Sequence, residues 1–258
     1  MYSTFTGIYG QMYDSVFKTF AQNDSIQYII KIPTGSITEI CTKIAVNIYQ
    51  DYFLSFCESG SQVNVYLTTT ASVKPFTSGP YPTEASAVNH VEIVNNILMI
   101  VDNNDDPFIR SGGVYLYYLN VASKNPADVL TMLDFIDNED LQIEGFRGMP
   151  FIASADFHKP LFNRDEYAIF ITEARTGNIF VFLFELSANK QEAVYLQKRL
   201  LDLNRLIPES VKHPTPLRVI NINIVDYTVR TQPRMKIEYV LLLTVRNWHH
   251  IELMLIFD

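Results

Sequence analysis

The densest group of side chains that could do chemistry is an acidic run that begins at Asp102. Asp102, Asn104 and Asp106 fall at alternate positions, and carboxylate and amide oxygens are the ligands that calcium prefers. The run departs from a calcium-binding loop, since Pro107 stands where that loop needs glycine and Gly113 stands where it needs glutamate. Because Asn and Asp also suit tight turns, we favour an acidic hairpin loop, with a calcium site as the alternative.

The other reactive side chains form no catalytic constellation in the sequence. A second acidic run spans residues 137–140, and two carboxylates about 5–10 Å apart could hydrolyse a glycoside, but nothing in the sequence brings the two runs together. His249 and His250, as neighbours in a predicted strand, would point to opposite faces. No Gly-x-Ser-x-Gly elbow marks a serine nucleophile. We therefore expect no enzyme activity and no cofactor.

Aromatic residues are abundant, with 15 tyrosines, 17 phenylalanines and one tryptophan. Tyr115 and Tyr117 stand in one apolar run, and Trp248 lies in a predicted turn. Exposed rings at these positions would form a binding patch for protein or sugar. Packing between sheets is the alternative, and we favour it for any individual ring.

The two cysteines, Cys41 and Cys57, lie symmetrically about Tyr49. A hairpin centred there could bring their sulfurs together on adjacent strands as a disulfide. We favour two buried thiols instead. A slip of one residue in the register would place the two side chains on opposite faces of the sheet.

Pairs of apolar, β-like runs recur four times along the chain, each pair joined by a polar connection. Such repetition indicates a modular β architecture. Three connections are too short for a parallel crossover, and the fourth contains Pro107 and Gly112-Gly113, which argue against a helix. We therefore predict antiparallel hairpins. The paired runs are 52–57 with 63–67, 97–101 with 114–119, 167–172 with 179–186, and 237–245 with 250–257.

Many of these runs are apolar on both faces. Between Ile179 and Leu186, alternate positions carry Ile, Val and Leu on one face and three Phe residues on the other. A sheet with one solvated face would alternate apolar with polar residues, so these strands require neighbours above and below. Sheets stacked face to face around an axis, as in the blades of a propeller, satisfy this requirement.

The run from Tyr167 to Phe182 resembles the second strand, glycine-containing turn and third strand of a WD-repeat β-propeller blade. Glycine-containing turns of the same kind occur at 59–66 and 111–118, and the likeness covers residues 37–258. The Gly-His and Trp-Asp dipeptides of that family are absent from the sequence. The resemblance implies an all-β, propeller-like stack of about four antiparallel blades with three to four strands each.

We predict two parts, an N-terminal segment at residues 1–36 and a propeller-like domain at residues 37–258. A strand expected at residues 25–32 could supply a missing outer strand to the last unit and so close the ring. The alternative is an incomplete ring, or a fragment of a larger assembly. Open sheet edges in such a ring would recruit partners.

Two segments have helical spacing, and helices there would make the fold α+β. Ser187 is a candidate N-cap for a helix through Ala193, Leu196 and Leu200. Asn125-Pro126 is a suitable helix start before the apolar residues of 129–136.

The composition of the chain limits the classes of partner that we expect. The net charge is −8, with 28 acidic and 20 basic side chains, so an acidic surface argues against nucleic acid. No stretch approaches the roughly 18 apolar residues that span a bilayer, so we expect no membrane insertion. We predict a non-enzymatic scaffold or assembly subunit that binds other protein subunits or copies of itself. A glycan- or calcium-binding propeller module is the alternative, and the sequence leaves the compartment open.

Overall fold

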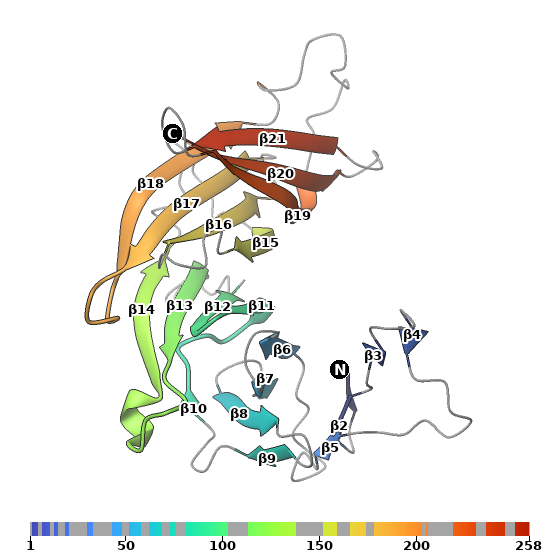
Figure 1. The fold of residues 1–258 in the computed structure, drawn as a ribbon, viewed down its shortest axis with the longest axis vertical. Helices are drawn as coiled ribbons and strands as arrows, with labels where there is room; N and C mark the ends of the chain where they lie inside the picture. The colour runs from blue at the N-terminus through green and yellow to red at the C-terminus, as the bar shows by residue number, and fades with distance from the viewer. Residues whose placement is uncertain are drawn as a thin grey trace.

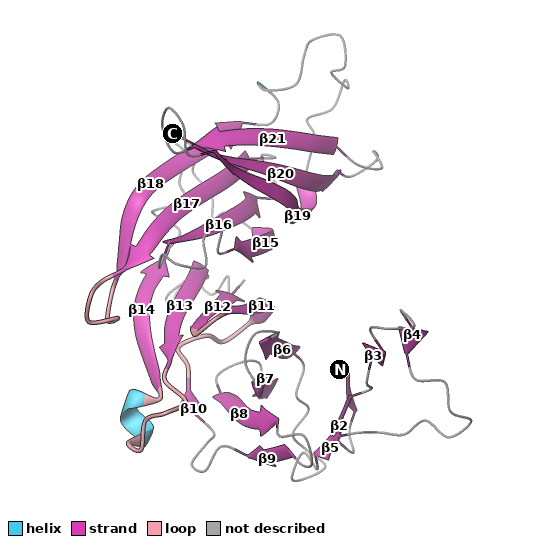
Figure 2. Cartoon of the chain, viewed as in Figure 1, coloured by secondary structure: helices cyan, strands magenta, loops and turns pink. Residues whose placement is uncertain are grey.

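The chain is described from a computed structural model. Residues 81–102, 113–137 and 178–202 are described throughout, and elsewhere the described residues are Arg205 and the strands bounded below. Four large antiparallel sheets follow one another along the chain (Figure 1). Figure 2 shows strands in nearly all of the described elements. The described residues therefore have an all-β fold.

The first sheet has the strand order β10-β8-β7-β6, with β9 also paired to β8, and the second has the order β11-β12-β13-β14. Every pairing within them is antiparallel. The bounds are Lys43–Asn47 (β6), Tyr52–Cys57 (β7), Gln62–Thr68 (β8), Val73–Pro75 (β9), Tyr81–Pro82 (β10), Val88–Val94 (β11), Ile97–Asp102 (β12), Gly113–Leu119 (β13) and Leu130–Ile136 (β14).

The third sheet has the order β15-β16-β17-β18, and the fourth has the order β19-β20-β21. The four predicted hairpins are confirmed as β7–β8, β12–β13, β16–β17 and β20–β21. The bounds are Ile152–His158 (β15), Glu166–Glu173 (β16), Asn178–Leu186 (β17), Ala193–Asp202 (β18), Val219–Arg230 (β19), Lys236–Val245 (β20) and Ile251–Phe257 (β21).

Two small sheets precede the large ones. One has the order β1-β2-β5 and the other pairs β3 with β4. In the described residues β5 pairs with β2, and the ring-closing strand at residues 25–32 stays a prediction. Pairing with β2 closes a much shorter loop than pairing with the fourth sheet, and loop closure costs less entropy when the loop is short. The bounds are Tyr2–Thr4 (β1), Gly7–Gly10 (β2), Tyr13–Asp14 (β3), Thr19–Phe20 (β4) and Ile30–Ile32 (β5).

The large sheets lie along an arc, and their first strands contact one another in sequence. Strand β6 contacts β11, β11 contacts β15, and β15 contacts β19. Neighbouring propeller blades are placed around their axis in this way. The arc of described strands is open between the fourth sheet and the N-terminal strands (Figure 1), so a closed ring stays a prediction.

The second sheet buries both of its faces. Leu98 and Ile100 of β12 belong to a core shared with the first sheet. Met99, between them, belongs to a core shared with the third sheet, and all three side chains are 0% exposed. Each such side chain contributes about 1.5–3 kcal/mol on burial. We predicted that strands with two apolar faces are covered by a sheet on each side. The second sheet confirms this prediction.

The α+β alternative, with helices in these two segments, is wrong. Residues Ala193–Asp202 form β18, which pairs with β17. The register shifts between Leu183 and Phe184 of β17, and the bulge on β18 breaks the alternation of period two that marks a strand. At the other segment, Asn125 caps a single 3₁₀ turn, η2 (Pro126–Asp128), and β14 follows. Pairing with the neighbouring strand outweighs local helix propensity in both places.

Gly113 begins β13 where the backbone of β14 approaches closely. A Cβ built at Gly113 would overlap the carbonyl oxygen of Ile136 and lie 2.9 Å from Cε2 of Phe135. We therefore expect Gly113→Ala to lower the free energy of unfolding by about 1–3 kcal/mol, the usual cost of overpacking. Urea unfolding followed by circular dichroism measures this change, and an unchanged midpoint would contradict the close approach.

Candidate functional site

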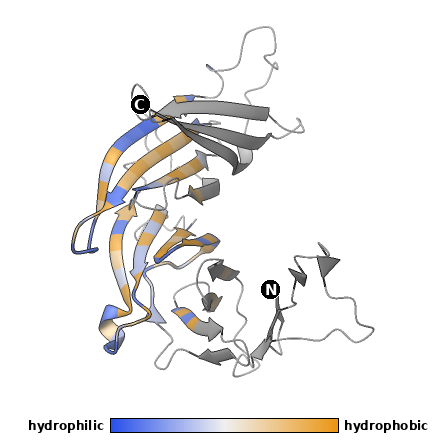
Figure 3. Cartoon of the chain, in the orientation of Figure 1, coloured by the Kyte–Doolittle hydropathy of each residue, from blue (hydrophilic) through white to orange (hydrophobic). Residues whose placement is uncertain are grey.

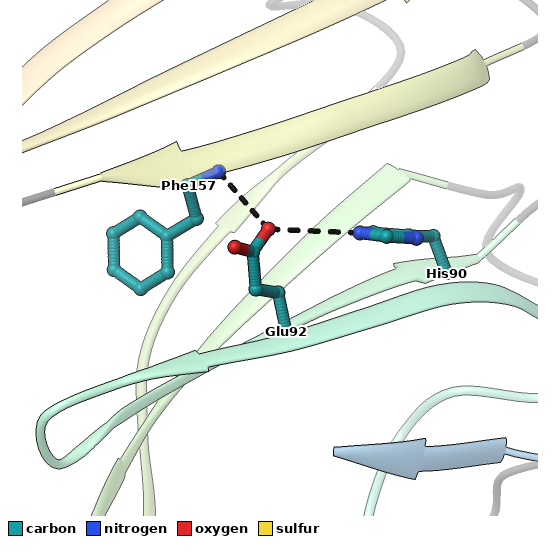
Figure 4. A network of polar contacts seen from close by, with 3 residues as sticks. All are labelled: His90, Glu92 and Phe157. Carbon is teal, nitrogen blue, oxygen red and sulfur yellow. Dashed lines mark hydrogen bonds and ion pairs between the residues drawn. The ribbon is translucent and has the colours of Figure 1, made fainter. Parts of the chain in front are cut away.

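Polar contacts join the second and third sheets at their inner strands. His90 and Glu92 of β11 are two residues apart and so share a face of the strand. The backbone N–H of Phe157 on β15 donates to Oε2 of Glu92 at 3.1 Å, and Nε2 of His90 lies 3.6 Å from the same oxygen (Figure 4). An imidazole beside a carboxylate can serve acid–base chemistry. Here the carboxylate holds a strand of the neighbouring sheet, so its evident role is structural.

The outer strands of the same two sheets are joined as well. The hydroxyl of Tyr195 on β18 donates to Oδ2 of Asp134 on β14 at 2.5 Å. Beside the turn between β17 and β18, Nζ of Lys190 lies 3.5 Å from the hydroxyl oxygen of Tyr118 on β13. Contacts at both the inner and outer strands fix the second sheet against the third. The two sheets are therefore joined by polar contacts at both ends as well as by their shared core.

We did not single out Glu92 from the sequence, although the polar pattern around it could have marked it. His90 and Glu92 are polar at alternate positions of the run 88–94, which is otherwise largely apolar. Such alternation marks one face of a strand as different from the other. The partner could not be read from the sequence, because Glu92 and Phe157 are 65 residues apart.

Asp102, the first residue of the predicted calcium cluster, is buried at the end of β12. Its Oδ2 accepts hydrogen bonds from the backbone N–H of Ser86 at 2.8 Å and from the Ser86 hydroxyl at 3.3 Å. Its Oδ1 accepts from the backbone N–H of Ala87 at 3.0 Å. The carboxylate thus anchors the segment that leads into β11. Asn104 and Asp106 lie outside the described residues.

The tyrosines predicted as a binding patch lie inside the protein. Tyr115 and Tyr117 are 2% and 4% exposed, and the ring of Tyr115 stacks on Phe135 with centroids 4.3 Å apart. The hydroxyl oxygen of Tyr117 accepts a hydrogen bond from the backbone N–H of Glu84 at 3.0 Å. Both rings lie in the core shared with the first sheet, so they pack between sheets, as we favoured for any individual ring, and do not form an exposed patch. Trp248 lies outside the described residues.

Burial raises the pKa of Tyr117. Loss of water around the phenol raises the pKa of Tyr117 above its ordinary value of 10.0, the Glu84 carboxylate raises this pKa further, and the Glu84 N–H opposes both. In the unfolded chain the phenol ionises near pH 10. The contribution of Tyr117 to stability is therefore complete below pH 10 and declines as the pH rises from there through the folded pKa.

We expect this decline to disappear when the phenol is removed. The stability of the wild-type chain relative to Tyr117→Phe should fall as the pH rises from 8 to above 10. Urea unfolding of both proteins at each pH measures the difference. A difference that stays constant across this range would contradict a buried, neutral Tyr117.

The two thiols that we favoured for Cys41 and Cys57, and the disulfide that is their alternative, both stay predictions. Cys57 ends β7 with its Cα opposite Gln62 of β8, and Cys41 lies outside the described residues. On the other side, β6 pairs with β7 in a register that sets Lys43 opposite Phe56. That register differs by one residue from the one that would set Cys41 opposite Cys57. A slip of this size favours two thiols over a disulfide.

The remaining predicted groups do not converge within the described part of the chain. Residues 138–140 of the second acidic run and the pair His249-His250 lie outside it. Among the described residues, no group of three or more His, Cys, Asp or Glu side chains is placed to hold a metal ion. No described helix has the length and apolar content needed to cross a bilayer.

No protein-family model and no curated protein matches the chain. Among solved structures, Sqt1 of Saccharomyces cerevisiae is similar with a TM-score of 0.41 and 8% identity, over 78% of this chain and 43% of that one. U3-55K gives a TM-score of 0.44 and 10% identity, over 93% and 55%. A protein from Lactobacillus plantarum gives 0.36 and 10%, over 96% and 77%.

Sqt1 and U3-55K are WD40 β-propeller proteins. The present chain spans about half the length of each, with 43% and 55% of those structures covered. TM-scores below 0.5 establish neither a closed propeller nor a function for this chain.

Proposed function

We propose that the chain is a non-enzymatic scaffold or assembly subunit that mediates protein–protein interaction. The observation that supports this proposal is the contrast between the faces and the edges of the sheets. The sheets cover one another's faces, whereas the last strands of the second and third sheets carry the large apolar side chains that are exposed in the described residues: Met132 on β14 and Val194, Leu196 and Leu200 on β18. Exposed edges of this kind recruit other chains.

The described carboxylates at the best-defined polar sites act within the fold. Glu92 accepts a backbone N–H from the next sheet, and Asp102 accepts two backbone N–H groups from the segment before β11. A general acid or base needs a carboxylate that can reach a substrate proton. These two are engaged in holding elements together, which favours a structural protein over a hydrolase.

The test measures the mass of the particle that the chain forms under native conditions. We expect size-exclusion chromatography with light scattering, on the chain taken from its own cells and at micromolar concentration, to give a mass above that of one chain. Native mass spectrometry then assigns the stoichiometry. A folded monomer in both measurements would count against a scaffold.

A ligand-binding module for calcium or glycans is the alternative function. Because the Asp102 carboxylate already accepts three hydrogen bonds, we expect calcium to leave the melting temperature unchanged. Thermal unfolding across a calcium titration, with magnesium as the control, measures this. A saturable rise with calcium alone would favour the ligand-binding module.

A further inference from the structure

Strand β18 is a long edge strand on the outer side of the arc (Figure 1). It has ten residues and stands last in the order β15-β16-β17-β18. In the described part of the chain, β17 is its hydrogen-bonded neighbour. The edge of such a strand presents backbone N–H and C=O groups to which another extended segment can pair.

Strand β18 combines two protections that are common at edges, charged residues and a bulge, with exposed apolar side chains. Proteins guard edges by shortening them or by filling them with charge and proline, and Figure 3 shows polar and apolar segments mixed along β18. Val194, Leu196 and Leu200 are 41%, 50% and 43% exposed, and in the described residues only Met132 of β14 joins them as an exposed large apolar side chain. The apolar exposure is therefore concentrated on this strand.

Two adjacent basic residues lie among these apolar side chains. Lys198 and Arg199 are both exposed, and neighbours in a strand point to opposite faces, so each face of the edge carries a positive charge. The acid at the end of the strand, Asp202, has its Oδ2 3.3 Å from Nε of Arg205. On a chain of net charge −8, β18 carries two basic side chains and one acidic side chain.

This charge pattern discriminates between possible occupants. Two copies of β18 paired antiparallel in full overlap would set Lys198 of each copy diagonally across from Arg199 of the other, within reach of these long side chains. Like charges at such positions destabilise the pairing, and two chains of net charge −8 also repel each other. An acidic segment meets the same net charge but avoids the contact between like charges at this edge. Repulsion of the wrong strand and attraction of the right one together give specificity.

We propose that β18 binds, by strand addition, an extended segment of a partner protein in which two adjacent acidic residues are flanked by apolar ones. In an antiparallel pairing the acidic pair lies opposite Lys198 and Arg199, and apolar side chains lie opposite Leu196 and Leu200. The inference rests on the scaffold function proposed above and adds the surface and the chemistry of the partner.

The test uses two synthetic peptides and a charge reversal. One labelled peptide, Thr-Thr-Val-Glu-Glu-Thr-Val-Thr-Val-Thr, supplies the acidic pair, and its match has two lysines in place of the glutamates. Two opposite-charge pairs across strands are worth roughly a two- to thirtyfold difference in Kd. By fluorescence anisotropy we expect the wild-type chain to prefer the acidic peptide by that factor. The double variant Lys198→Glu with Arg199→Glu should prefer the lysine peptide.

Two further variants distinguish an effect of charge at the β18 edge from an effect of the chain's overall charge. Since Nζ of Lys198 lies 4.3 Å from the ring centre of Tyr195, Arg199→Glu alone serves as a variant that leaves this contact in place, and it should weaken acidic-peptide binding in the same direction. Lys124→Glu makes the same charge change at an exposed residue between β13 and β14, and it should leave the preference unchanged.

Three outcomes would overturn the inference: no binding of either peptide, equal binding of both, or a preference that survives charge reversal. A wild-type dimer that Arg199→Glu dissociates would assign β18 to a second copy instead. If the peptides fail while the chain still forms the complex expected under its proposed function, the scaffold stands and the β18 site alone is rejected. If the chain is a monomer without partners, the scaffold itself is rejected.

Discussion

Replacing Phe184 by alanine should lower the free energy of unfolding by about 3–5 kcal/mol, the range for large aromatic truncations in a core. Phe184 is 0% exposed and lies in the core shared by the second and third sheets. Its ring contacts an aromatic ring on each of the other three strands of its sheet. The centroid distances are 6.2 Å to Phe157 on β15, 5.4 Å to Tyr167 on β16 and 6.0 Å to Tyr195 on β18.

The loss should be large because two effects add. Removing the ring gives up its apolar burial, and the cavity that remains is lined by rings on three other strands that cannot all move inward. Leu196→Ala is the matched control, since Leu196 on the adjacent strand is 50% exposed, and its cost should stay within about 0.5 kcal/mol. Urea unfolding of both variants measures the contrast. Equal costs would mean that the second and third sheets do not share a core.

Asp102→Ala should cost about 2–4 kcal/mol, because losing hydrogen bonds to a charged group is costly but removing the buried carboxylate also removes its desolvation penalty. The donors are the backbone N–H groups of Ser86 and Ala87 and the hydroxyl of Ser86. With the carboxylate gone, the segment that leads into β11 is no longer fastened to the end of β12. We expect the loss in the absence of any metal.

The absence of metal makes this measurement discriminating. In a calcium loop without its ion, removing one of several clustered carboxylates relieves repulsion and stabilises the chain. A structural Asp102 predicts the opposite sign. Glu192→Ala controls for the change in net charge, since Glu192 is exposed in the turn before β18. Stability in Asp102→Ala equal to or above that of the control would refute the structural role.

Much of the sheet organisation could be predicted from the sequence because it depends on local pattern. Alternating apolar positions mark strands, and the run that became β17 showed large apolar residues at nearly every position. That two-sided pattern predicted a sheet covered on both faces. The structure places Phe180, Phe182 and Phe184 in the core shared with the second sheet, and buries Ile179 and Val181 on the opposite face.

The rest could not be read locally, because it depends on contacts distant in sequence. The bulge in β18 gave this segment an apolar spacing typical of a helix. The bulge is defined by the register of β18 with β17, which the sequence of β18 alone does not specify. The burial of Tyr117 depends on the first sheet packing over its face, which no pattern within β13 specifies. Asp102 resembled a metal ligand because its carboxylate oxygens can be read from the sequence. The two backbone N–H groups that donate hydrogen bonds to them cannot.

A crystal structure of the chain is the most direct test of the central claim that its sheets are stacked with both faces covered. The account predicts that Leu98 and Ile100 of β12 pack toward the sheet of β6–β10, while Met99 packs toward the sheet of β15–β18. A structure in which one face of the β11–β14 sheet meets solvent, or is covered by helices, would contradict it.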